Sequence, residues 1–133
     1  MKIIRRISIQ LAATLMLVIL LCVVVFHLLV IVGAIPYSIV WGGRLESASQ
    51  MYLFETVSIT INLTVIAIVG MKVGYLKAFI PERAIIVLLW VLTILFALNT
   101  LGNIFSKTTL ETFLFTPLTF ISSVLCYRLA IER

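Results

Sequence analysis

The stretch ISIQLAATLMLVILLCVVVFHLLVIVGAI, residues 7–35, decides the fold class because it contains no Asp, Glu, Lys or Arg. A helix of about 20 mostly apolar residues is long enough to cross a bilayer core roughly 30 Å thick. The apolar run is continuous and does not alternate with polar positions, which favours a helix over a barrel strand. This segment therefore predicts a transmembrane helix.

Three more apolar segments have the length of a membrane span, at about residues 48–71, 82–105 and 110–131. Helix-start signals stand at their edges: Ser47–Gln50 and Thr108–Glu111 each fit a capping box, and Pro81 suits a first helical turn. Short connections favour antiparallel packing of consecutive helices. We expect an all-α fold, in which residues 1–133 form a single four-helix transmembrane bundle.

The composition of the whole chain agrees with membrane insertion. Of 133 residues, 63% are hydrophobic and 11% are charged, whereas soluble domains average about 45–50% and about 25%. A chain this short could not hide so much apolar surface from water. These figures exclude a soluble globular domain, a disordered chain and a nucleic-acid-binding module. The expected surroundings are the lipid bilayer of a cell membrane, crossed several times.

The distribution of basic residues predicts the orientation. One side of the predicted bundle carries eight of them: Lys2, Arg5, Arg6, Lys72, Lys77, Arg83, Arg128 and Arg133. The other side carries Arg44 and Lys107 alone. Because Lys and Arg accumulate on the cytoplasmic side of membrane proteins, both termini should be cytoplasmic. The first span far exceeds the 7–15 residues of a signal-peptide core, so we expect an uncleaved anchor.

The sequence is poor in groups that perform redox or metal chemistry. Its two cysteines, Cys22 and Cys126, do not form a CxxC pair, and it has one His and no Asp. No nucleotide-binding loop or hydrolase motif is present. We therefore expect no metal site and no cofactor. Enzymatic activity is the least supported class of function, because no motif supplies a positioned acid–base pair.

Polar side chains collect in the outer half of the predicted bundle: His27, Arg44, Glu46, Glu55, Asn62, Asn99, Asn103, Lys107 and Glu111. Such groups are costly in lipid unless they face one another or water. Glu55, Ser58 and Asn62 are spaced to share one helix face, and Asn99 lies one turn from Asn103. We expect these side chains to converge on the interior of the bundle or on its outer mouth.

Two functional hypotheses follow from this cluster. In the first, an outward-facing polar pocket binds or transports a small polar molecule, a cation or a lipid headgroup. Its expected residues are Glu55 as the ionisable centre, Asn62, Asn99 and Asn103 as hydrogen-bonding groups, Arg44 as a counter-charge at the mouth and His27 as a proton partner. In the second, the chain is a non-catalytic structural or accessory subunit, in a homo-oligomer or with a membrane partner, and Glu55 pairs with Arg44.

Three features resemble a group of small bacterial proteins. They are Trp41-Gly42-Gly43-Arg44, the stretch Asn99-Thr100-Leu101-Gly102-Asn103, and Pro117. Together they look like small four-helix bacterial inner-membrane proteins to which no activity is attached. The resemblance spans about the last hundred residues, and it implies a four-helix protein of the bacterial inner membrane.

The orientation can be tested by cysteine labelling in a variant whose Cys22 and Cys126 are replaced by alanine. Ser47→Cys should react with a membrane-impermeant maleimide added to intact cells, because Ser47 is expected outside. Ala78→Cys should react only after the membrane is permeabilised. Labelling of Ala78→Cys but not Ser47→Cys in intact cells would contradict the predicted orientation.

Overall fold

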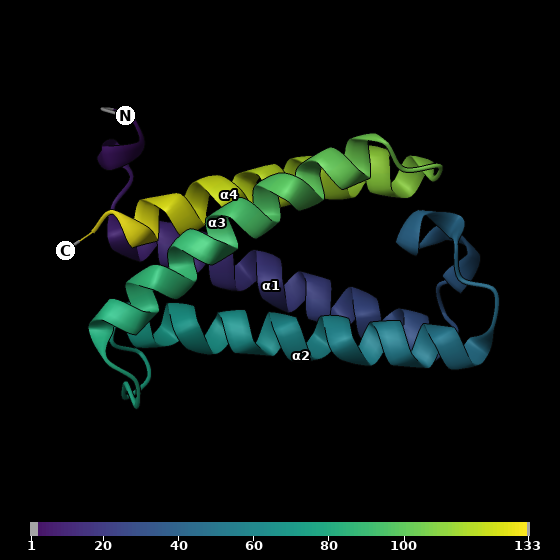
Figure 1. Cartoon of the computed structure of the whole chain (residues 1–133), viewed down its shortest axis with the longest axis horizontal. Coiled ribbons are helices and arrows are strands. Elements are labelled where there is room, and N and C mark those ends of the chain that lie inside the picture. The colour runs from purple at the N-terminus through teal and green to yellow at the C-terminus, as the bar shows by residue number, and fades with distance from the viewer. Residues whose placement is uncertain (1–2, 133) are drawn as a thin grey trace.

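The structure, a computed structural model, describes residues 3–132, and its regular elements are all helical (Figure 1). The long helices are α1 (Ile9–Ile31), α2 (Ala48–Lys72), α3 (Glu82–Ile104) and α4 (Thr116–Ala130). The shorter turns are η1 (Ile4–Arg6), η2 (Tyr37–Ile39), η3 (Trp41–Gly43) and the π-helical turn η4 (Glu111–Phe115). Four helices are long and apolar enough to cross a membrane, the fourth counted from Glu111. Lys2 and Arg133, which were counted for the orientation, lie outside the described residues.

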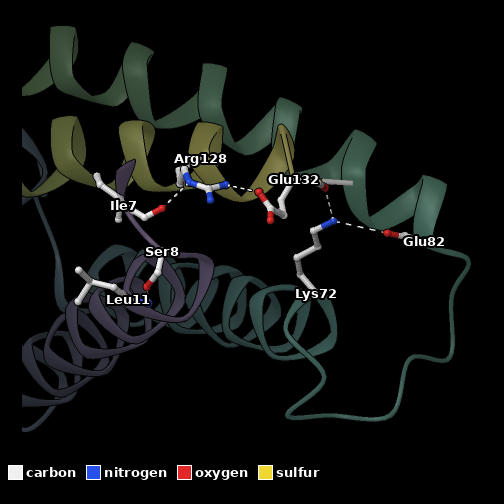
Figure 2. Close-up of polar contacts among 7 residues, drawn as sticks. All are labelled: Ile7, Ser8, Leu11, Lys72, Glu82, Arg128 and Glu132. Carbon is white, nitrogen blue, oxygen red and sulfur yellow. Dashed lines mark hydrogen bonds and ion pairs between the residues drawn. The ribbon is translucent and has the colours of Figure 1, made fainter. Parts of the chain in front are cut away.

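Helix α1 is shorter than the predicted span of residues 7–35. It begins after Ser8, whose hydroxyl accepts from the amide of the third helical residue at 3.1 Å (Figure 2). It ends at Ile31 because Gly33 adopts a left-handed φ of +78°. The amide of Gly33 then donates to Val30 O and that of Ala34 to Leu29 O, which is a Schellman motif. Residues 32–35 therefore belong to the loop.

Helix α2 begins where the sequence predicts, but its cap differs in one contact. Ser47 Oγ accepts from the Gln50 amide at 3.2 Å, as expected for a capping box. The Gln50 side chain reaches one residue further back and accepts from the Glu46 amide at 3.0 Å. Both contacts satisfy amide groups at the helix entrance, so the start of α2 is fixed by local chemistry.

The bundle consists of two helix pairs. Helix α1 packs along α2, α3 packs along α4, and α1 also contacts α4 (Figure 1). The expectation that all consecutive helices are close neighbours is wrong for α2 and α3, which make few contacts. The α3–α4 pair is joined instead by hydroxyl groups: Thr100 Oγ1 donates to Thr119 Oγ1 at 3.0 Å, and Ser123 Oγ donates to Thr93 O at 2.8 Å. Such interhelical bonds commonly hold membrane helices together.

We name the two ends of the bundle by their contents. We call one end of the bundle the basic end; there α1 and α3 begin, at Ile9 and Glu82, and α2 and α4 end, at Lys72 and Ala130. We call the opposite end the loop end; it is marked by the helix bounds Ile31, Ala48 and Ile104 and by Glu111. The main core belongs to the basic end and takes fully buried residues from all four helices, including Ala12, Met16, Val69, Leu89 and Cys126. Small residues such as Ala12 let the helix backbones approach closely there.

The outer surface of the helices is apolar. Only 17% of the most hydrophobic window of α1 and 22% of that of α3 is buried inside the bundle. The remaining Leu, Ile and Val side chains point outward, which a soluble protein of this size would not tolerate. This surface is the one expected of helices that face lipid tails.

A polar network closes the basic end (Figure 2). The buried Arg128 donates through Nε to Ile7 O and through Nη1 to Glu132 Oε2, each at 2.7 Å. Lys72 Nζ donates to the Glu132 carbonyl at 2.7 Å and lies 3.6 Å from Glu82 Oε1. Arg128 thus joins the segment before α1 to the end of α4.

Leu89 and Leu88 offer a matched test of the packing, because they are adjacent on α3 with exposures of 0% and 37%. Leu89→Ala should lower the unfolding free energy by about 2–5 kcal/mol, since it leaves a cavity in the core. Leu88→Ala should lower the unfolding free energy much less, because its side chain is exposed. Thermal unfolding of both variants in detergent, followed by circular dichroism, measures the difference. Equal losses would show that the core at the basic end is wrongly placed.

Candidate functional site

A cavity of about 580 Å³ lies at the loop end, between the α1–α2 pair and the α3–α4 pair. Residues of all four helices line it, together with Val40, Trp41, Gly42 and Arg44 from the connection between α1 and α2. Its volume falls within the roughly 300–1,000 Å³ of ordinary small-molecule sites. We call it the loop-end cavity.

The wall of this cavity changes character with depth. Close to the loop end it carries many of its polar groups, among them His27, Arg44, Asn99, Asn103 and Glu111. Further in, it is mainly apolar, with Leu20, Val65, Phe96 and Leu118 on the wall and Asn62 and Ser122 as polar interruptions. At 1.5 Å per residue, Leu20 lies about 16 Å along α1 from its loop end and His27 about 6 Å. A bound molecule would therefore meet polar groups first and apolar groups deeper inside.

The six residues singled out in the sequence are not all on the wall. His27, Arg44, Asn62, Asn99 and Asn103 line the cavity. Glu55 does not: its side chain is fully buried, at 0% exposed, behind two of the lining residues. The expected ionisable centre is thus separated from the cavity by its own hydrogen-bond partners.

Both oxygens of the Glu55 carboxylate are engaged. The Trp41 indole Nε1, which can only donate, lies 2.9 Å from Oε1. Oε2 lies 2.5 Å from His27 Nδ1, and because a carboxylate accepts, that ring nitrogen carries the proton. The second ring nitrogen of His27, Nε2, has no hydrogen-bond partner in the part of the chain that the structure describes. Nε2 is therefore the ring nitrogen of His27 that can contact a molecule in the cavity.

The expected pairing of Glu55 with Arg44 is not formed. Across residues 3–132 Arg44 makes no ion pair, and its exposed side chain lies beside Gly42 at the edge of the cavity. The reason is steric: the Trp41 ring occupies the approach to Glu55 and packs edge-on against Phe54, with ring centroids 4.9 Å apart. Arg44 keeps its predicted place at the mouth without the predicted partner.

Sequence reasoning did not predict the role of Trp41 beside Glu55. Its backbone is left-handed, with φ +53°, and Gly42 and Gly43 follow at φ +68° each. Left-handed backbone costs a non-glycine residue roughly 1–2 kcal/mol, so packing and the bond to Glu55 must hold it. The available signal was the Trp-Gly-Gly sequence, in which two glycines permit a sharp reversal after a residue with an indole donor.

A second carboxylate holds the same loop from the other helix pair. Glu111 was expected to complete a capping box with Thr108, and that expectation is wrong. Its Oε2 accepts from the Gly42 amide at 2.8 Å and from Ser106 Oγ, while the Thr108 amide donates to Ser106 Oγ at 3.1 Å. The loop crosses between the two pairs in Figure 1, and Glu55 and Glu111 tie it to both.

The three asparagines are placed differently. Asn62 Nδ2 donates to the Ser58 carbonyl of its own helix at 2.8 Å, and Asn103 Nδ2 donates to Thr119 Oγ1 of α4 at 3.3 Å. Asn99 is exposed to the cavity, and its amide makes no side-chain hydrogen bond within the described chain. Asn99 therefore offers both a free donor and a free acceptor to a ligand.

No group of three or more His, Cys, Asp or Glu side chains suited to a metal ion occurs in residues 3–132. Comparison of the chain with protein-family models, curated proteins and solved structures gives no match. The cavity and its lining residues are therefore the basis for a functional proposal.

Glu55→Gln tests the buried carboxylate. The amide retains one acceptor oxygen, so one of the two N–H groups of His27 and Trp41 would face an amide donor. The unfolding free energy should fall by about 1–3 kcal/mol, measured by thermal unfolding in detergent. Glu46→Gln, at an exposed carboxylate, is the control and should be neutral. Arg44→Gln should also be near neutral, and a loss equal to that of Glu55→Gln would restore Arg44 as the partner.

Proposed function

We propose that the chain is a four-span cell-membrane protein with both termini in the cytoplasm and the loop end outside. The excess of basic residues at one end supports this orientation. Among the described residues that end carries six basic residues, Arg5, Arg6, Lys72, Lys77, Arg83 and Arg128, whereas the loop end carries Arg44 and Lys107. The loop-end cavity would then open on the outer side of the membrane.

We further propose that the protein binds, or binds and transports, a small amphipathic molecule in the loop-end cavity. The observation that carries this proposal is the cavity of about 580 Å³ between the four helices, whose wall presents the amide of Asn99 without a side-chain hydrogen bond in the described chain. A polar side chain without a partner is costly in an apolar setting, so a ligand or water should complete it. The apolar deeper wall would take the hydrophobic part of the same molecule.

The charges around the cavity favour a neutral or anionic head over a cation. Glu55 is sealed from the cavity, and Glu111 already accepts two hydrogen bonds. The cation at the mouth, Arg44, has no ion-pair partner within residues 3–132. A cationic ligand would be repelled by this guanidinium and would find only the second carboxylate oxygen of Glu111, Oε1, to receive it, whereas an anionic or amide head would gain a donor.

The alternative is a non-catalytic structural or accessory subunit, in a homo-oligomer or beside a membrane partner. It is favoured by the complete pairing of Glu55, which ties α1, α2 and the loop together. Under this alternative the cavity residues would specify packing and would not recognise a soluble or lipid-like molecule.

A tryptophan reporter can distinguish the two functions. The chain has two tryptophans, and Trp90→Phe leaves Trp41 as a single reporter on the cavity wall. In nanodiscs, brominated single-chain amphiphiles with amide or phosphate heads should quench Trp41 saturably, and those with quaternary ammonium heads should quench it less. Asn99→Leu should weaken the binding about five- to tenfold, as expected for one lost hydrogen bond.

The control for this experiment is Thr64→Val, which removes a hydroxyl from an exposed position of α2 outside the cavity. It should leave quenching unchanged. Quenching that does not saturate, or that is identical in Asn99→Leu and its parent, would reject ligand binding and support the accessory-subunit alternative.

A further inference from the structure

A second cavity, of about 790 Å³, lies at the basic end, at the opposite end of the bundle from the proposed ligand site. Its wall includes Arg5, Ile86, Trp90, Arg128, Ile131 and Glu132. We propose that this basic-end cavity binds a phosphate group, and that the phosphate belongs to an anionic lipid of the surrounding membrane. This inference is independent of the function proposed for the loop-end cavity.

Arg128 supplies donors that are already fixed in direction. Its side chain is 6% exposed and is held through Nε by Ile7 O and through Nη1 by Glu132. A guanidinium has five N–H groups, and its remaining nitrogen, Nη2, has no hydrogen-bond partner among residues 3–132. Figure 2 shows the bonds made by the other two nitrogens. Arg128 lines the basic-end cavity, so Nη2 is the nitrogen of its guanidinium that is left to bind an anion there.

Arg5 adds a second guanidinium on the same wall. It lies on η1, is exposed, and makes no ion pair within residues 3–132. The wall also carries one carboxylate, Glu132, which is occupied by Arg128 at 2.7 Å. Two guanidinium groups against one neutralised carboxylate leave a net positive cavity. Guanidinium forks match phosphate oxygens in geometry and charge, which makes phosphate the anion best suited to it.

The apolar part of the wall indicates that the phosphate comes from a lipid. Ile86, Trp90 and Ile131 border the arginines. Trp90 lies about 12 Å along α3 from its basic end, and its ring packs edge-on against Tyr127 with centroids 5.4 Å apart. Tyr127 lies three residues from the end of α4, near the level of lipid headgroups that tyrosine favours, whereas Trp90 lies deeper, at the level of the lipid tails. Basic pockets between membrane helices are known sites for anionic headgroups, whereas free phosphate would gain nothing from the apolar residues.

Arg5→Gln is the direct test, because Arg5 is exposed and its loss should not disturb the fold. Wild-type protein in mixed nanodiscs should retain phosphatidylglycerol in preference to phosphatidylcholine when it is extracted and weighed by native mass spectrometry. Arg5→Gln should lower the affinity for phosphatidylglycerol about tenfold, the loss expected for a charge-assisted pair. Lys77→Gln is the matched control: it removes the same charge from an exposed loop at the same end, outside the cavity.

Arg128→Lys provides a second variant that keeps the buried charge but loses the fork, and it should also weaken lipid retention. Excess inorganic phosphate that displaces the lipid would assign the site to phosphate in general, and failure to displace it would assign the site to the lipid. Equal losses in Arg5→Gln and Lys77→Gln, or no loss in either arginine variant, would overturn the proposal. Quenching of Trp41 should be unchanged in Arg5→Gln, so the two cavities can fail or succeed separately.

Discussion

The loop end depends on one buried carboxylate. Glu55 has no exposed surface, and its two oxygens accept from the imidazole of α1 and from the indole of the loop. A buried charge without partners would cost several kcal/mol, so His27 and Trp41 must meet Glu55 for the fold to form. The loop meets this requirement with Trp41 in a left-handed backbone, from which its indole donates to Glu55.

The same loop explains how a cavity persists between the two helix pairs. At the basic end, alanines and other core residues draw all four helices together. At the loop end, α3 and α4 are bonded to each other, and the loop spans from Glu55 on one pair to Glu111 on the other. These bonds satisfy the polar groups of the loop and of the two carboxylates. The space between the helix pairs therefore need not be filled by side chains that would pair with them.

The two ends of the molecule differ in the charged group that the fold buries: a carboxylate at the loop end and an arginine at the basic end. At the loop end, Glu55 and Glu111 accept hydrogen bonds from other parts of the chain, and the groups left to the cavity include the amide of Asn99 and the guanidinium of Arg44. At the basic end, Arg128 is held by a carbonyl and a carboxylate, and its third guanidinium nitrogen has no partner among residues 3–132. Both proposals rest on donors that the fold holds in place and does not satisfy.

The sequence by itself determined the four helices and most of their ends, because hydropathy, Ser47 and Pro81 act over a few residues. It also indicated which polar side chains belong to the loop end. Only the tertiary structure decided their partners: Trp41 and not Arg44 reaches Glu55, and Glu111 accepts from Gly42 and not from its own helix start. It also decided that α2 makes few contacts with α3. These outcomes depend on backbone direction and on contacts between residues distant in the chain. Local spacing carries no information about either, whereas the burial of charge makes them decisive.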